Sequence, residues 1–278
     1  MQSVLVTGAS SGIGASTVLE LDRAGMTVFA GVRNLDDAAP LAKQTSDRLQ
    51  LLVLDITDAA SIASAVAEIR TAVGAAGLDA VVNVAGVGVP GPLEVLEPEQ
   101  LRAELEVNVV GQVALTRALL PLLRDATGRV VFVGSIGGKV AVQFAGAYHA
   151  SKFAMEAIAD SWRQELTPDG IPVILIEPGP IATPIWAKAA TDLDDMLVGG
   201  HPEIGRYADR LRSFQDSLRS AAKNGASSAT VAETIHRALT STRPRTRYAV
   251  GGGAKLVSAL RPLVPQRVLD AIGRRTAA

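Results

Sequence analysis

Tyr148 and Lys152, in the stretch YHASK, carry a phenol and an ammonium group four residues apart. On a helix, this spacing places two side chains on one face about one turn apart. A free phenol has a pKa of about 10, but a cation within a few ångströms favours the phenolate and lowers that pKa. The two residues could therefore exchange a proton with a substrate, although Tyr and Lys at this spacing also occur on ordinary helix surfaces.

A glycine-rich stretch, TGASSGIG, follows an apolar run at residues 3–7 and precedes a segment with helical spacing. Glycines at such a turn let a pyrophosphate approach the backbone, and the N–H groups of the helix N-terminus attract it. We expect a dinucleotide site formed by Gly8, Ser10, Ser11, Gly12, Ile13 and Gly14. The spacing is not G-x-G-x-x-G, and the Gly-Lys-Ser/Thr ending of a nucleoside triphosphate loop is missing, which disfavours a kinase or ATPase.

Arg33 follows the second apolar run, in the sequence VFAGVRN. An acidic residue at the end of this strand binds the ribose 2′-hydroxyl of NAD, whereas an arginine suits the 2′-phosphate of NADP. Val32 occupies the place of the acidic residue, and the forked guanidinium of Arg33 matches a phosphate. The pattern favours NADP(H), with NAD(H) as the alternative. Asp36 and Asp37 lie farther along, where the dipole of a helix start explains them.

Short runs of Val, Leu and Ile alternate with longer segments of helical periodicity. The expected strands cover residues 3–7, 26–32, 49–55, 78–86, 128–135, 171–179 and 246–251, and the expected helices cover 12–25, 59–73, 98–123, 148–166 and 228–242. The strands are continuously apolar, which indicates a parallel sheet covered on both faces. We therefore predict an α/β fold: a Rossmann-type doubly wound parallel sheet of about seven strands with helices on both faces, in a single domain over residues 1–278.

Two segments lie outside this alternation. Residues 181–225 are polar and too long for a routine connection, and we expect a lid or substrate loop there. Residues 251–278 form a basic amphipathic C-terminal helical extension, which Pro262 and Pro265 interrupt. Such a stretch could contact a membrane surface, but packing on its own domain or on a neighbouring subunit is the more frequent role.

The composition excludes several classes of function. Of the 278 residues 48% are hydrophobic and 20% charged, so the chain can bury a large core. The net charge of -1 gives no general attraction to nucleic acid or anionic membrane. There is no cysteine, and the three histidines lack a ligand-like spacing, so we expect no metal site. No apolar run reaches the roughly 20 residues of a membrane helix, and the early strand leaves no room for a signal peptide, which predicts a cytoplasmic protein.

Five motifs occur in order between Val4 and Thr183: TGASSGIG, NVAG, a serine that ends the fifth strand, YHASK, and a PG pair after the sixth strand. Together they resemble the short-chain dehydrogenase/reductase family, and the C-terminal part resembles that of its steroid and retinol dehydrogenases. The resemblance implies an oxidoreductase that uses a nicotinamide cofactor. The usual NNAG motif reads NVAG here, so Val84 replaces an asparagine that supports the turn.

The resemblance implies four catalytic residues. Tyr148 would be the general acid and base, and Lys152 would lower the pKa of Tyr148 and bind the nicotinamide ribose. Ser135 would hold the substrate oxygen beside the tyrosine. Asn108 would hold a water in a proton relay to the lysine, and an ordinary hydrogen-bond partner on the helix is the alternative role for its amide.

The resemblance also implies further contacts to the cofactor. Asp55 would meet the adenine amino group, and Ile56 would line the adenine ring. Ile181 and Thr183 would contact the nicotinamide carboxamide. The remaining implied contacts are at Asn83, Ala85, Gly86, Pro178 and Gly179.

Four other residues receive different interpretations. Trp186 is expected to form a wall of the substrate pocket, and Trp162 to pack inside a helix layer. Glu177 is interpreted as a structural residue at a strand end. His149 lies within YHASK but away from the tyrosine face, so we expect it on the helix surface or in a subunit contact.

These observations favour an NADP(H)-dependent oxidoreductase that transfers a hydride between nicotinamide and an apolar ketone, aldehyde or secondary alcohol. Within the family, an NAD-dependent alcohol dehydrogenase is the alternative. A sugar-nucleotide epimerase or dehydratase is disfavoured by the glycine spacing and by the lack of a larger C-terminal domain. A non-catalytic NADP-binding regulator is the alternative from another class. We expect a small-molecule substrate, no nucleic-acid partner, and a homodimer or homotetramer.

Overall fold

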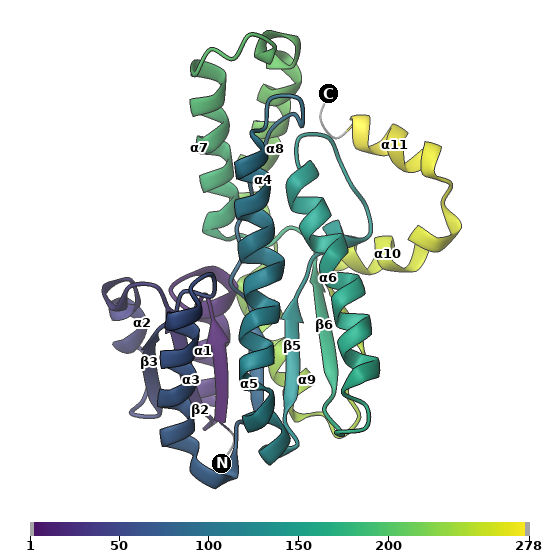
Figure 1. Cartoon of the computed structure of the whole chain (residues 1–278). Helices are drawn as coiled ribbons and strands as arrows, with labels where there is room; N and C mark the ends of the chain where they lie inside the picture. Colours follow the sequence, from purple (N-terminus) through teal and green to yellow (C-terminus); the bar gives the residue numbers. More distant parts are fainter. Residues whose placement is uncertain (1–2, 276–278) are drawn as a thin grey trace.

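Seven parallel strands form one central sheet, and helices cover both of its faces (Figure 1). The structure is a computed structural model that describes residues 3–275. The strands are β1 (Ser3–Thr7), β2 (Thr27–Val32), β3 (Leu49–Val53), β4 (Ala80–Asn83), β5 (Arg129–Val133), β6 (Val173–Pro178) and β7 (Arg247–Val250). Their order across the sheet is β3-β2-β1-β4-β5-β6-β7. The predicted Rossmann-type doubly wound sheet is confirmed.

Both faces of the sheet are buried, as the continuous apolar strands predict. Leu5 pairs with Phe29 across β1 and β2, and both side chains belong to the core on one face. The neighbouring residues Val4 and Val28 also pair, and their side chains belong to the core on the other face. Successive side chains of a strand point to opposite faces, so each strand supplies both cores.

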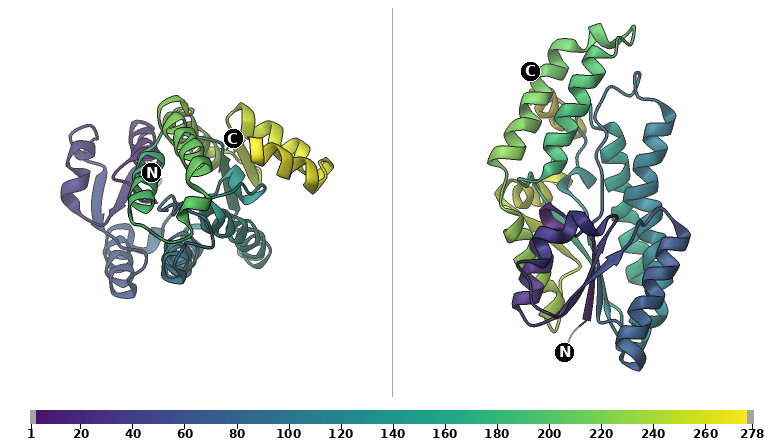
Figure 2. Two further views of the ribbon diagram at one scale, coloured as in Figure 1. Left: turned by 90° about the horizontal axis from the view of Figure 1, so that it is seen from above. Right: turned by 90° about the vertical axis from the view of Figure 1, so that its left-hand side faces the viewer.

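The helices form two layers around the sheet (Figures 1 and 2). The layer on one face consists of α3 (Ala59–Val73), α5 (Gln112–Ala126) and α6 (Gly146–Glu165). The layer on the other face consists of α1 (Gly12–Arg23) and α9 (Ser228–Thr240), which pack against each other. Trp162 lies on α6 and packs against the first core, as predicted. A short helix, α2 (Ala39–Ala42), follows β2.

The strand order reverses between β1 and β4, because the chain builds β2 and β3 on one side of β1 before it crosses to the other side. In doubly wound sheets, ligands bind beside this point, outside the carboxyl ends of the strands. The chain turns from β1 into α1 through the glycine-rich stretch, which therefore lies at this edge.

A long helical segment runs from Pro98 to Ala126 along the α3, α5 and α6 layer. It consists of α4 (Pro98–Leu105), a π-helical turn (Glu106–Gly111) and α5. Among the described residues this is the one helix whose length and composition would allow it to cross a membrane, although charged residues such as Glu106 and Arg117 interrupt its apolar sequence. The helix lies in the core layer, with Leu115 and Leu119 fully buried against the sheet.

Most of the segment 181–225 is a helical hairpin rather than a loop. Its two helices, α7 (Pro184–Val198) and α8 (Ala208–Asn224), pack side by side beyond the carboxyl edge of the sheet (Figure 1). Together with Val95 and Phe144 from outside the segment, they form a separate apolar core: Val95, Phe144, Ala189, Ala190, Leu193, Ile204, Leu211, Phe214 and Leu218. A short parallel bridge between Ile181 and Ala226 joins the two ends of the hairpin.

The C-terminal extension is helical, as predicted. It consists of α10 (Gly252–Leu260), a short 3-10 turn (Arg261–Leu263) and α11 (Gln266–Arg275), and it extends away from the body of the molecule (Figures 1 and 2). Leu256, Leu260 and Leu263 are exposed along it.

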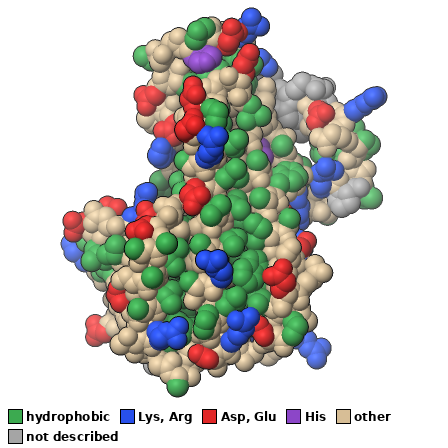
Figure 3. All heavy atoms as spheres, viewed as in Figure 1, with side chains coloured by type: hydrophobic (Ala, Val, Ile, Leu, Met, Phe, Trp, Pro, Cys, Tyr) green, Lys and Arg blue, Asp and Glu red, His purple; other side chains and the backbone are tan. Residues whose placement is uncertain are grey.

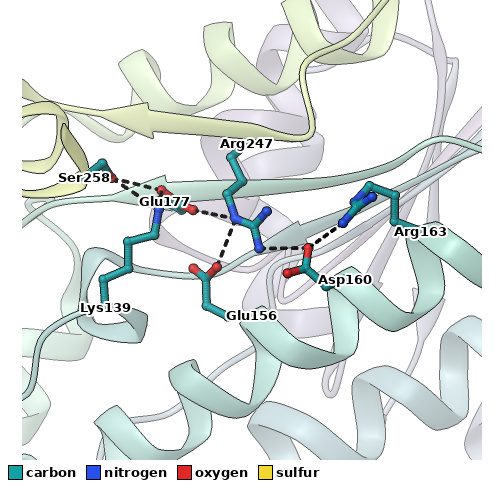
Figure 4. Close-up of polar contacts among 7 residues, drawn as sticks. All are labelled: Lys139, Glu156, Asp160, Arg163, Glu177, Arg247 and Ser258. Carbon is teal, nitrogen blue, oxygen red and sulfur yellow. Dashed lines mark hydrogen bonds and ion pairs between the residues drawn. The ribbon is translucent and has the colours of Figure 1, made fainter. Parts of the chain in front are cut away.

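A group of alternating charges connects this extension to the sheet and to α6 (Figure 4). Glu177 of β6 is buried, and its carboxylate pairs with Lys139 at 2.8 Å and with Arg247 of β7 at 3.3 Å. Arg247 also pairs with Glu156 at 3.0 Å and with Asp160 at 2.9 Å, both on α6. The hydroxyl of Ser258 on α10 donates to Glu177. We call Lys139, Glu156, Asp160, Arg163, Glu177, Arg247 and Ser258 the charge cluster.

Candidate active site

A cleft of about 320 Å³ opens at the carboxyl ends of the central strands. Most of the residues singled out in the sequence line it: Gly8, Ser10, Ser11, Gly12, Ile13, Gly14, Arg33, Asp55, Ile56, Ala85, Gly86, Ser135, Tyr148, Lys152, Pro178, Gly179, Ile181, Thr183 and Trp186. Asn83 and Asn108 do not line the cleft. The structure therefore brings together side chains from almost the whole length of the sheet edge.

The glycine-rich turn has close backbone contacts that exclude larger residues. A Cβ atom at Gly14 would lie 2.1 Å from the carbonyl oxygen of Gly8, so α1 can approach the turn only with glycine there. Gly8 and Gly12 have φ angles of +62° and +55°, which favour glycine. The Ser11 side chain makes no capping hydrogen bond, and the first turn of α1 carries no acidic residue. This arrangement fits the diphosphate of a dinucleotide cofactor.

Arg33 and Asp55 lie together at the far end of the cleft. The Asp55 carboxylate accepts hydrogen bonds from the backbone N–H of Thr57 at 2.9 Å and from its hydroxyl at 2.7 Å. These two bonds lower the pKa of Asp55, and the nearby charge of Arg33 contributes in the same direction. Thr57 also lines the cleft and was not predicted. Its position two residues after Asp55 was the one signal for it in the sequence.

Tyr148 and Lys152 face the cleft from the first two turns of α6, which begins at Gly146, two residues before the predicted start. The Lys152 ammonium lies 5.6 Å from the centre of the Tyr148 ring. Its Nζ donates a hydrogen bond to the carbonyl of Val133, at the end of β5, at 3.2 Å. Ser135 follows the same strand, and its hydroxyl accepts from the N–H of Gly137 at 3.0 Å.

The pKa of Tyr148 is raised in this structure, and not lowered as expected. Burial raises the pKa of the Tyr148 phenol, while a hydrogen bond with Ser135 acts to lower it and the charge of Glu104 raises it further. Burial also lowers the pKa of Lys152 to about 8, and the charge of Glu104 opposes that shift. Desolvation therefore favours the neutral forms of both groups.

Asn108 is fully buried in the π-helical turn, behind the cleft wall. Its Oδ1 accepts from the N–H of Val87 at 2.8 Å, and its Nδ2 donates to the carbonyl of Val87 at 2.9 Å. The same Nδ2 lies 3.0 Å from the hydroxyl of Ser151 on α6. The amide thus fixes the segment after β4 against α6. Its role in holding a water remains a prediction.

Asn83 is also buried below the cleft and donates to the hydroxyl of Thr116 on α5 at 3.1 Å. The turn after it is supported by Thr7, which sequence reasoning missed. The Thr7 hydroxyl accepts from the N–H groups of Val84 and Ala85 at 2.9 and 3.0 Å. Thr7 is the last residue of β1 and the first residue of the TGASSGIG motif, and this position was the signal in the sequence that could have identified it.

His149 is buried, and the expectation of a surface position is wrong. Its Nδ1 is 2.9 Å from the carbonyl oxygen of Gly137. A Cβ atom at Gly137 would lie 2.9 Å from that nitrogen, so the loop after β5 packs directly on the imidazole. Burial lowers the pKa of His149, and the hydrogen bond with the Gly137 backbone opposes that shift. The residue therefore holds the loop that carries Ser135.

Trp186 lies at the entrance of the α7–α8 hairpin, with its ring centre 6.4 Å from that of Tyr148. Its indole N–H donates to the carbonyl of Ile181 at 2.7 Å, which fixes the ring. A small recess continues from the cleft behind Tyr148 and under the hairpin. Its lining has no charged side chain: Gly88, Val89, Pro90, Ala145, Tyr148, Ile185, Trp186, Ala189, Phe214 and Leu218.

The fold and the cleft define a class of protein. A doubly wound sheet with a glycine-rich turn at its point of reversal, and a tyrosine and a lysine in the same cleft, is the arrangement of a nicotinamide-dependent dehydrogenase. The family described as short chain dehydrogenase matches residues 2–194. The chain belongs to this family and is an oxidoreductase that acts on alcohol or carbonyl groups with a nicotinamide cofactor.

Individual relatives match over nearly the full chain. The sequence is 36% identical to NADPH-dependent 3-dehydrocapnine reductase of Ornithobacterium rhinotracheale, over 98% of this chain and 96% of the relative. It is 35% identical to retinol dehydrogenase 16 of Mus musculus, over 97% of this chain and 86% of the relative. A short chain dehydrogenase from Burkholderia cenocepacia, solved in complex with NADP, has a TM-score of 0.75 at 25% identity, with 100% of both chains covered.

Proposed function

We propose that the protein is an NADP(H)-dependent oxidoreductase that interconverts an apolar ketone or aldehyde and the corresponding alcohol, with Tyr148 as the general acid and base. The observation that carries the proposal is the shared cleft, in which Tyr148, Lys152 and Ser135 lie together with the glycine-rich turn and Arg33. The NADPH-dependent name of the Ornithobacterium relative and the NADP complex of the Burkholderia structure support the cofactor assignment.

The residues of the chain divide the work of the reaction. Nicotinamide supplies or accepts the hydride when the cofactor is bound. The turn from Gly8 to Gly14 would hold the diphosphate, and Lys152 would hold the nicotinamide ribose. During reduction, the Tyr148 hydroxyl gives its proton to the carbonyl oxygen, which Ser135 holds by a hydrogen bond. The Lys152 ammonium stabilises the phenolate that this transfer leaves behind.

The proposal of an apolar substrate rests on the recess beside Tyr148. A substrate group that enters it meets only apolar surface and the aromatic faces of Trp186 and Phe214. A charged group placed there would lose its hydration without gaining a partner, which is costly. Retinol, named in one relative, is itself a largely apolar alcohol. We therefore place the apolar part of the substrate next to its reacting carbon, between Tyr148 and the hairpin.

A panel assay tests the function. NADPH oxidation should accelerate with long-chain aliphatic ketones, retinoid aldehydes or steroid ketones, and should not accelerate with charged 2-oxo acids. The reverse assay, NADP⁺ reduction by the matching alcohols, should show the same preference. Tight NADPH binding without turnover of any member of the panel would contradict the proposal and favour a non-catalytic NADP-binding regulator.

Substitution of Arg33 by Ala tests the choice of cofactor. Hydrogen bonds to a charged group contribute about 1.5–3 kcal/mol, so the Kd for NADPH is expected to rise about 10- to 100-fold. The Kd for NADH, which lacks the 2′-phosphate, should change little. Isothermal titration with both cofactors measures this, and Arg70→Ala, an exposed arginine on α3, serves as the control. Equal losses for both cofactors would refute the phosphate assignment and leave NAD(H) as the alternative.

We further propose that copies of the chain associate through the outer face of α5 and α6. In Figure 3, hydrophobic side chains gather on the face that α4, α5 and α6 present to the viewer. Val110 in the π-helical turn and Phe153 on α6 are 49% and 42% exposed. Sedimentation equilibrium should give twice or four times the chain mass of 28.8 kDa.

A cytoplasmic location remains a prediction, as does the less favoured contact of the C-terminal extension with a membrane.

A further inference from the structure

Glu104 is a buried acidic residue for which the proposed reaction has given no role. It lies in the last turn of α4, four residues before Asn108, and its side chain is fully buried. One carboxylate oxygen, Oε2, accepts a hydrogen bond from the N–H of Val89 at 3.1 Å. The other, Oε1, accepts from Nδ2 of Asn108 at 3.2 Å. Both contacts come from N–H donors, which suits an ionised carboxylate, because a protonated one would point its own hydrogen at a donor.

Such a charge needs a counter-charge, because an isolated carboxylate is expensive to bury. Within the described part of the chain, no cation forms an ion pair with Glu104 at direct contact distance. Lys152 on α6 is the cation whose charge acts on Glu104. A Cβ atom built at Gly86 would lie 3.2 Å from Oδ1 of Asn108 and 3.9 Å from Nζ of Lys152. The Asn108 side chain thus contacts Glu104 directly, and it packs near the same backbone position as the Lys152 ammonium.

The elements around Glu104 offer few other charges. Residues 84–90, which supply the Val89 contact, contain no ionisable side chain. On α6, the two titratable groups that interact electrostatically with Glu104 are Lys152 and Tyr148. The pKa of His149, also on α6, is lowered by burial, which disfavours its charged form. The electrostatics of this region therefore reduces to three groups: one carboxylate, one amine and one phenol.

We propose that Glu104 is the buried counter-charge of Lys152, and that it acts as a positioning residue that sets the pH range in which the Tyr148 and Lys152 pair works. The inference rests on the proposed function, since it assigns a role in that reaction. Its negative charge keeps the Lys152 ammonium charged in a dry site and favours the protonated form of Tyr148. The Asn108 amide binds the carboxylate directly, and Lys152 Nζ, which makes no direct ion pair with Glu104, stays available to the cofactor ribose.

The titration of the groups supports this arrangement. Burial raises the pKa of Glu104 to about 7, and the charge of Lys152 counteracts the rise. Burial lowers the pKa of Lys152 to about 8, and the charge of Glu104 counteracts that fall. Between these two values the carboxylate and the ammonium are both charged. Reduction, which requires a protonated Tyr148 and a charged Lys152, should therefore lose activity as the pH rises above about 8.

The substitution Glu104→Gln tests the proposal through pH profiles. Removal of the negative charge lowers the pKa of Lys152 and of Tyr148 together, so kcat/KM profiles for reduction and oxidation should both move to lower pH, by about one pH unit. The matched control is Glu106→Gln, which removes an exposed charge two residues farther along the same helix and should leave both profiles in place. Profiles that fall in height without moving would overturn the proposal, because a purely structural role predicts that result.

A second measurement separates this inference from the proposed function. The chain has three tyrosines, so in a Tyr207→Phe, Tyr248→Phe background the tyrosinate absorption reports Tyr148 alone. Its titration midpoint should be lower in the Glu104→Gln variant than in the parent, whether or not any substrate is turned over; equal midpoints would refute the counter-charge. If the Glu104→Gln variant does not fold, Glu104→Asp, which keeps the charge, must retain the midpoint of the parent. A fall of the midpoint in the Glu104→Asp variant would refute the electrostatic role.

Discussion

Substitution of Tyr148 by Phe is expected to reduce NADPH-dependent carbonyl reduction by about 10²- to 10⁴-fold, the usual contribution of a positioned general acid. Phenylalanine keeps the ring that packs 6.4 Å from Trp186, and only the proton-donating hydroxyl is lost. Affinity for NADPH should stay close to that of the wild type, because the glycine-rich turn, Arg33 and Lys152 are unchanged. Steady-state kinetics together with direct titration of NADPH separate these two effects.

The other two tyrosines provide the controls. Tyr207, on the hairpin side of the molecule, donates to Glu94 outside the cleft. Tyr248, on β7, accepts a hydrogen bond from the N–H of Arg245 and also lies outside the cleft. Tyr207→Phe and Tyr248→Phe should keep wild-type turnover. If Tyr148→Phe kept more than about a tenth of the activity, another group would have to donate the proton.

Substitution of Arg247 by Met is expected to give the largest loss of stability. Arg247 lies within the charge cluster and contacts three carboxylates, those of Glu156, Asp160 and Glu177. Glu177 is only 1% exposed, so the variant leaves a buried carboxylate with Lys139 as its remaining cation and Glu156 as a repulsive neighbour. Removal of one partner from a buried ion pair costs about 3–5 kcal/mol. Urea unfolding followed by circular dichroism measures the change in the free energy of unfolding.

Two further variants serve as a control and as a rescue test for this prediction. Arg102 pairs with Glu99 on α4, where the two side chains are 72% and 75% exposed. Because exposed ion pairs contribute only about 0–1 kcal/mol, Arg102→Met should have a small effect. The double variant Arg247→Met, Glu177→Leu should recover part of the loss, since it also removes the buried carboxylate that has lost one of its two cations. Equal stabilities of the Arg247 and Arg102 variants would show that the charge cluster contributes no more than surface pairs do.

Much of the fold was predictable because its signals are local. Continuous apolar strands such as β1 and β5 indicate a sheet buried on both faces, and the glycine-rich turn marks the place where α1 meets a phosphate. The positions of Tyr148 and Lys152 in the cleft follow from helical spacing once the strand order is known. These features depend on neighbours in sequence, so a single chain reveals them.

The errors concern interactions between distant segments. The burial of His149 depends on the loop around Gly137, which packs on it from another part of the chain. The pKa of Tyr148 depends on how deeply the hairpin and the segment after β4 enclose it. The spacing of residues in the sequence does not show how much of the phenol is removed from water. Glu104 was not singled out in the sequence, because its partner Val89 lies on a loop that the sequence does not place. The helices of the 181–225 segment were not predicted, because the segment is mostly polar and only a few of its residues pack in the small apolar core.

The α7–α8 hairpin separates the part of the protein that contacts the substrate from the part that binds the cofactor. Its two ends meet at the bridge between Ile181 and Ala226, where the Ala182 N–H bonds to Ala226 at 2.9 Å and the Ala226 N–H bonds to Pro180 at 3.0 Å. Between these ends, the hairpin packs largely on itself and supplies most of the apolar wall beside Tyr148. Mutations inside it can therefore reshape the substrate wall while the glycine-rich turn and its cofactor contacts keep their geometry. For evolution and for protein engineering alike, this makes the hairpin a separate target for change, joined to the cofactor-binding body by backbone hydrogen bonds at its two ends and by packing on Val95 and Phe144.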